Sequence, residues 1–179
     1  RATIRDPEKQ RLANPEYYME ESLFDPLIEL FLRQGVYLNV PLWTAKAFNP
    51  RASGWGWEQL ARELANDPSL AFVPAKEREA WTAEERNISS QEREQRIVGL
   101  QKVHAFIKQY AQRGGKFVAG SDTSDGDMPG LWTHYEMQSL VDAGLTPMQA
   151  ILSATKWPAE LFHLEKEIGT VEVGKKADV

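Results

Sequence analysis

The chain has 179 residues, of which 42% are hydrophobic and 10% aromatic, enough to build a sizeable core. Its net charge of -5 is spread along the sequence without a basic stripe, which argues against nucleic acid as a partner. No uninterrupted apolar run is long enough to span a membrane, and nothing at the amino terminus is typical of a signal peptide, so the compartment stays unknown. Because there is no cysteine, any metal must be held by carboxylate or imidazole groups.

The first part of the chain predicts a loop, a helix and a strand. Residues 1–22 are polar and predict a loop. From Leu23 to Gln34 apolar residues recur with helical spacing, Asp25-Pro26 suits a helix start, and Gly35 suits its end. Alternating apolar and β-branched residues then predict a strand over 36–42.

The same order returns later in the chain. A helix is predicted over 97–113, and a strand over 116–121 follows it. Alternation of helix and strand is typical of a parallel α/β sheet, in which function gathers at the carboxyl ends of the strands. Asp122 directly follows the second strand, so its carboxylate is the leading candidate for chemistry. The alternative is that Asp122 only caps the loop.

Between the two strands lies a long segment, 43–92, with four tryptophans and many charges. It is too long for a simple βα loop. A segment inserted after a strand's carboxyl end lies over the active-site face, so a lid or substrate wall is predicted. For most of the segment the stronger interpretation is structural, because tryptophans usually pack within their own segment and charged runs usually form a solvated helix face.

After Asp122 the sequence predicts two helices and a strand. One helix begins at His134 and ends near Gly144. The next runs from Thr146 to about Thr155, because Thr146, Pro147 and Gln149 form the pattern of a capping box. Val171 and Val173 alternate with a glutamate and predict a short strand.

Several short segments in this last part of the chain stand in the order and spacing of one family. They are Ala119-Gly-Ser-Asp122, His134-Tyr-Glu136, the stretch from Val141 to Thr155, Gly169-Thr170, and Gly174-Lys-Lys-Ala-Asp178. Together they resemble the carboxyl-terminal end of the amidohydrolase superfamily of metal-dependent hydrolases, most closely its imidazolonepropionase-like and prolidase-like branch. Upstream, Gly35-Val-Tyr-Leu-Asn39 resembles the seventh barrel strand of that family.

The resemblance implies an α/β fold, a (β/α)₈ TIM barrel of about 250 residues. We therefore expect this chain to be a carboxyl-terminal fragment. Residues 1–165 would belong to the barrel, with 43–92 inserted over the active-site face, and 166–179 would begin the return to a small β-sandwich domain. The implied reaction is hydrolysis of a carbon-nitrogen bond in a cyclic amide, imide or dipeptide-like substrate by attack of metal-bound hydroxide. The fragment alone is expected to be inactive.

By the same resemblance, Asp122 is both a metal ligand and the catalytic general base. His134 would contact the substrate, although a histidine in the first turn of a helix is as often a surface or capping residue. The implied cofactor is a divalent metal, by default zinc as one or two ions, with most ligands outside this chain. The implied partner is a small-molecule or short-peptide substrate, and a homo-oligomer is left open. His104 and His163 are predicted to be structural.

A rival interpretation is a non-catalytic α/β binding module. Asp125, Asp127 and Glu136 stand at positions 1, 3 and 12 of a calcium-loop pattern, with glycine at position 6. Position 5 is proline, and the entering segment is a predicted strand where a calcium loop has a helix. Both features make calcium binding the secondary hypothesis.

Overall fold

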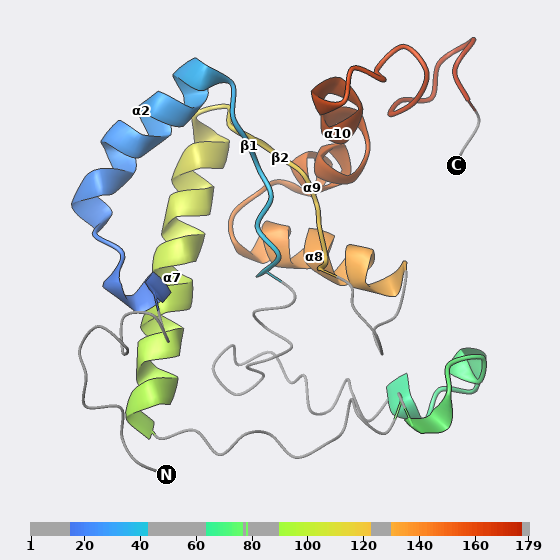
Figure 1. Cartoon of the computed structure of the whole chain (residues 1–179), viewed down its shortest axis with the longest axis horizontal. Coiled ribbons are helices and arrows are strands. Elements are labelled where there is room, and N and C mark those ends of the chain that lie inside the picture. Colours follow the sequence, from blue (N-terminus) through green and yellow to red (C-terminus); the bar gives the residue numbers. More distant parts are fainter. Residues whose placement is uncertain (1–14, 43–63, 77, 79–89, 123–129, 177–179) are drawn as a thin grey trace.

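The computed structural model describes residues 15–42, 64–76, 78, 90–122 and 130–176 (Figure 1). Strands β1 (Tyr37–Leu38) and β2 (Lys116–Phe117) form a parallel pair in which Tyr37 lies opposite Lys116. The N–H of Val118 extends the ladder to the Leu38 carbonyl oxygen at 2.9 Å. Parallel neighbours require a crossover connection, and helix α7 (Ser90–Gln112) lies within it. The predicted parallel α/β arrangement is thus present.

Both strands are shorter than the predicted segments 36–42 and 116–121. In the described part of the chain each strand has one neighbour, so residues beyond the shared ladder have no second strand to pair with. Pro41 also lacks the N–H that a ladder needs. Both strands lie within the predicted segments, and each ends where its hydrogen-bonded pairing with the other strand ends.

Helix α2 (Phe24–Gln34) confirms the first predicted helix to within one residue. Gly35 ends it with a left-handed φ of 63°, and its N–H bonds back to the last turn. The predicted loop before it contains two short 3-10 helices in its described part, η1 (Pro15–Tyr18) and η2 (Glu21–Leu23). The Lys102 ammonium group of α7 fixes η1 by donating to the Tyr17 carbonyl oxygen at 2.7 Å.

Helix α7 begins at Ser90, seven residues before the predicted start at 97 and inside the predicted insertion 43–92. The added residues are mostly glutamate, glutamine and arginine, which are good helix formers without an apolar face. Apolar periodicity therefore could not detect this part. Most of the predicted insertion lies outside the described residues. Its described part includes η3 (Pro68–Leu70), a short 3-10 helix.

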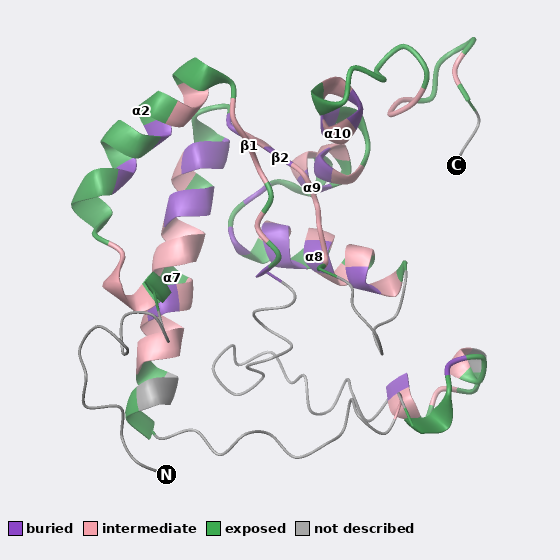
Figure 2. Ribbon diagram, in the orientation of Figure 1, coloured by how far each residue is buried: buried purple, intermediate pink, exposed green. Residues whose placement is uncertain are grey.

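The core is formed by buried side chains of α2, α7 and the strands, and it extends to the helices that follow β2 (Figure 2). Phe24 of α2 meets Phe106 of α7 edge to face, with ring centroids 5.2 Å apart. Tyr110 meets Phe117 of β2 in the same way at 5.5 Å. The Tyr110 hydroxyl donates to the Val36 carbonyl oxygen at 2.6 Å, which joins α7 to the start of β1.

Three further helices follow β2: α8 (Leu131–Asp142), α9 (Pro147–Ala154) and α10 (Lys156–Leu161). The capping box at the start of α9 is confirmed, because the Gln149 N–H donates to Thr146 Oγ1 at 3.2 Å and the Thr146 N–H to Gln149 Oε1 at 2.8 Å. Helix α8 begins three residues before the predicted start at His134. Ala119, just after β2, donates its N–H to the Ser153 carbonyl oxygen at 2.9 Å.

The predicted strand at Val171–Val173 is wrong for the described structure. These two valines are 89% and 108% exposed, and the segment forms turns. The Lys176 N–H donates to the Glu167 carbonyl oxygen at 2.8 Å, which folds the segment back on itself. Alternation alone does not make a strand where the described residues offer no neighbouring edge.

Candidate active site

The carboxyl ends of β1 and β2 meet at one edge, because the two strands are parallel. Beyond the ladder, β1 continues into Asn39 and β2 into Gly120. A Cβ atom built on Gly120 would lie 2.6 Å from Asn39 Oδ1 and 2.7 Å from Nδ2. The Asn39 carboxamide therefore lies directly against the Gly120 backbone, two residues before Asp122.

Asp122 is exposed at this edge and has a left-handed φ of 50°. Aspartate is one of the few residues with a side chain that adopts this conformation at modest cost. Within the described residues its carboxylate makes no hydrogen bond or ion pair. A solvated carboxylate with its lone pairs available can accept a proton or bind a cation. The structure thus places Asp122 at the predicted position.

The two faces of the strand pair differ in what covers them. Successive side chains of a strand point to opposite faces. Phe117 packs against Tyr110, so its face is covered by α7. Tyr37 and Lys116, which are paired across the ladder, share the other face.

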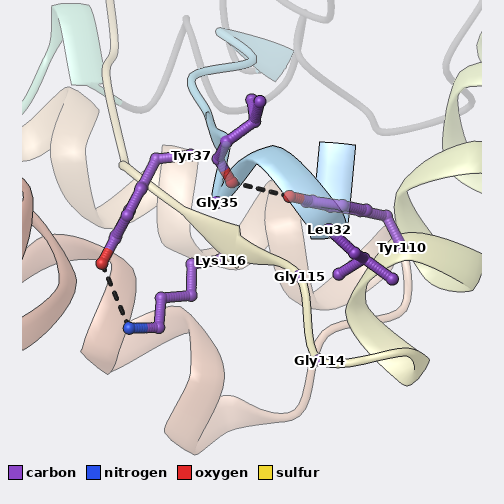
Figure 3. Close-up of a pocket in the computed structure, with 8 residues that line it drawn as sticks. Leu32, Gly35, Tyr37, Tyr110, Gly114, Gly115 and Lys116 are labelled. Atoms are coloured by element: carbon purple, nitrogen blue, oxygen red, sulfur yellow. Dashed lines mark hydrogen bonds between the residues drawn. The ribbon is translucent and has the colours of Figure 1, made fainter. Parts of the chain in front are cut away.

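That second face is closed by α10 at the amino-terminal ends of the strands. Lys116 Nζ lies 2.6 Å from Glu160 Oε2. It also lies 3.1 Å from the Tyr37 hydroxyl oxygen (Figure 3). The hydrogen bond from Lys116 lowers the pKa of the Glu160 carboxyl, and the same bond raises the pKa of Lys116. These residues tie α10 to both strands at the end opposite Asp122. The sequence did not predict this cluster, because Glu160 is 44 residues from Lys116 and 123 residues from Tyr37 along the chain.

A hollow of about 200 Å³ lies beside this cluster (Figure 3). Its walls come from the end of α2, the start of β1 and the junction of α7 with β2: Leu32, Gly35, Val36, Tyr37, Tyr110, Gly114, Gly115 and Lys116. Parallel α/β folds bind ligands at the carboxyl ends of their strands, and this hollow is at the other end. We therefore assign it to packing between elements and keep the candidate active site at Asp122.

The three histidines of the chain lie in different parts of the fold. His134 is exposed in the first turn of α8, and within the described residues no hydrogen bond or ion pair joins it to Asp122. His104 lies in α7, and His163 follows α10 with a φ of 59°, an ordinary way to end a helix.

Glu136 is fully buried in α8, and its Oε1 accepts the Leu42 N–H at 3.1 Å. It therefore holds the chain beyond β1 against α8. A calcium-loop ligand has to be open to the ion, so this burial contradicts the predicted role of Glu136. Asp125 and Asp127, the other two predicted calcium ligands, lie outside the described residues.

The described residues include no group of three or more histidine, aspartate or glutamate side chains that could hold a metal ion. Asp122 fits a metal as a single ligand, since it offers a solvated carboxylate. No helix in the described part of the chain is both long and apolar enough to cross a membrane.

A parallel strand pair, a crossover helix and an acidic residue at a strand's carboxyl tip define an α/β protein of the kind that carries its chemistry at that edge. The sequence profile of the Amidohydrolase family matches residues 14–179, and the chain belongs to this family. The family implies a TIM-barrel-like fold, metal-dependent hydrolase activity and a divalent metal. No curated protein and no solved structure matches the chain.

Proposed function

We propose that this chain supplies the carboxyl-terminal part of a metal-dependent hydrolase that cleaves a carbon-nitrogen bond. The proposed substrate is a cyclic amide, an imide or a dipeptide-like molecule, as in the imidazolonepropionase-like and prolidase-like branch. The observation that carries the proposal is the exposed Asp122 carboxylate at the carboxyl tip of β2, in a chain that the family profile matches from residue 14 to residue 179.

Asp122 has two roles in this proposal. One carboxylate oxygen holds the metal, and the other accepts a proton from the attacking water and delivers it to the leaving nitrogen. When bound, a divalent metal supplies Lewis acidity and lowers the pKa of a bound water to about 7. Zinc is the first choice, although oxygen and nitrogen ligands also suit manganese, iron and cobalt. His134 is proposed as a substrate contact because it is exposed on the helix that follows.

The remaining ligands have to come from outside the described residues. A catalytic zinc site uses about three protein ligands, and the described residues offer no cluster of that size. A TIM barrel needs eight strands, and the described residues form two. We therefore propose that residues 1–165 complete a barrel with other segments, that 166–179 lead toward a second domain, and that this part alone is inactive.

The test is Asp122→Asn in the full-length protein. The substitution removes the proton acceptor at nearly constant volume, so turnover should fall by about 100-fold or more, while the fold measured by circular dichroism is unchanged. Asp142→Asn is the matched control, because Asp142 is an exposed aspartate at the end of α8. Asp122→Asn turnover within about tenfold of the parent, a barrier change of roughly 1.4 kcal/mol, would overturn the assignment.

A further inference from the structure

We propose that Asn39 is a substrate-binding residue, whose carboxamide hydrogen-bonds the amide group of the substrate beside Asp122. This inference rests on the proposed function and adds a residue to the same site. It also extends that site from the tip of β2 to the tip of β1.

The position of Asn39 follows from the strand register. Tyr37 lies opposite Lys116, so two residues further Asn39 lies opposite Val118. This is the face that α7 does not cover, and α10 closes it at the opposite, amino-terminal ends of the strands. In a βα barrel the face away from the helices is the interior, and the carboxyl ends of the strands form the mouth of the active site. Asn39 thus lies where a bound substrate would be.

The contact with Gly120 fixes where the carboxamide lies. Both polar atoms of Asn39 come within 2.7 Å of the point where a Cβ of residue 120 would be. No side chain larger than hydrogen leaves room for this approach. The absence of a side chain at Gly120 therefore brings the Asn39 carboxamide next to the segment that presents Asp122.

The carboxamide is available to a ligand. Asn39 is exposed, and it makes no hydrogen bond within the part of the chain that the structure describes. On the same face Tyr37 and Lys116 are already bonded to each other and to Glu160. Among these interior-facing polar groups, Asn39 is the one that a substrate can still use.

The chemistry of a carboxamide matches the proposed substrate. Nδ2 donates two hydrogen bonds and Oδ1 accepts, which complements the C=O and N–H of an amide. The group is neutral, so it does not compete with Asp122 for a metal ion as a second carboxylate would. The Asn39 carboxamide would hold the scissile amide of the substrate next to the Asp122 carboxylate, the proposed proton acceptor.

The experiment compares the full-length parent with its Asn39→Ala variant. The probes are the cyclic amides dihydrouracil and hydantoin and the dipeptide glycyl-proline, and bound metal is measured by elemental analysis. We expect kcat/KM of Asn39→Ala to fall about tenfold, with metal content and melting temperature unchanged. Gln138→Ala removes an exposed carboxamide from α8 and should leave all three quantities unchanged.

Gly120→Ala tests the geometry without removing the carboxamide. Its new Cβ would displace the Asn39 side chain, so kcat/KM should fall in the parent background. In the Asn39→Ala background the atoms that would clash are gone, so the same substitution should have no further effect. A role of Asn39 in folding alone would not produce this coupling in kcat/KM.

The outcomes separate the two proposals. A parent that cleaves a probe, together with an Asn39→Ala variant within twofold of it, overturns the role of Asn39 and leaves the proposed function intact. Additive effects of the two substitutions also overturn it. A parent that cleaves none of the probes overturns the proposed substrate class and the role of Asn39 with it.

Discussion

Gly115 is the position where the packing of α7 on the strands can be tested most sharply. A Cβ atom added there would lie 2.3 Å from two carbons of the Tyr110 ring. Unstrained carbon contacts are about 3.5–4.0 Å, so the ring would have to move by more than about 1 Å. Tyr110 is 1% exposed, and its hydroxyl is bonded to Val36 at 2.6 Å. Moving the ring would therefore break this hydrogen bond and its packing against Phe117.

The expected cost of Gly115→Ala follows from these contacts. Overpacking a tight core costs about 1–3 kcal/mol, and losing the Tyr110 hydrogen bond adds about 1 kcal/mol, so we expect a loss of about 2–4 kcal/mol in the free energy of unfolding. Gly114 is the matched control, because it has a φ of 87° and nothing within 4 Å of its added Cβ. Gly114→Ala should cost about 1–2 kcal/mol through backbone strain alone.

Urea denaturation of the full-length protein, followed by circular dichroism, measures both costs. The discriminating background is Tyr110→Leu, which removes the ring. There the cost of Gly115→Ala should largely disappear, whereas the cost of Gly114→Ala should stay the same. If Gly115→Ala costs the same in both backgrounds, the steric explanation is refuted.

Three further predictions concern stability and association. Glu160→Gln should reduce the unfolding free energy by about 0.5–1 kcal/mol at pH 7. The folded-state pKa of Glu160 is below the ordinary 4.5, and that of Lys116 is above the ordinary 10.5. The stability difference between variant and parent, measured as urea midpoints, should therefore fade below pH 4.5 and above pH 10.5. A difference that is constant with pH would contradict the ion pair. Thr146→Ala should cost about 1 kcal/mol by removing the capping box of α9, whereas the neighbouring exposed Met148→Ala should cost less than about 0.5 kcal/mol by the same urea assay; equal costs would contradict the cap. The 179-residue chain expressed alone should self-associate in light scattering, because apolar side chains at η2 and α2 stay exposed, and a monodisperse monomer would count against incompleteness. These side chains are Leu23, Leu27 and Leu30.

Local signals in the sequence predicted local structure well. The capping residues Thr146 and Gln149 fixed the start of α9, and Gly35 fixed the end of α2, because each acts on backbone groups a few residues away. The start of α7 at Ser90 was missed, since its first turns have no apolar face.

Long-range relations could not be predicted from the sequence. Glu136 matched a calcium-loop pattern, yet the fold buries it against a backbone N–H 94 residues away. Asn39 was visible only as part of a strand-like segment, because its contact with Gly120 exists only when two distant strands pair. The position of Asp122 after a strand was predictable, because strand and loop are adjacent in the chain. Its roles in metal binding and proton transfer stay predictions.

Structural attachment and the candidate site lie at opposite ends of the strand pair. The cluster of Lys116, Tyr37 and Glu160 attaches the amino-terminal ends of the strands to α10. Asn39 and Asp122 lie at the carboxyl ends. Because the amino-terminal ends of the strands are attached to α10, the loops at the carboxyl ends can change in sequence with less effect on folding. Directed evolution of substrate preference would therefore do best to randomise residues around the strand tips and to leave the α10 anchor untouched.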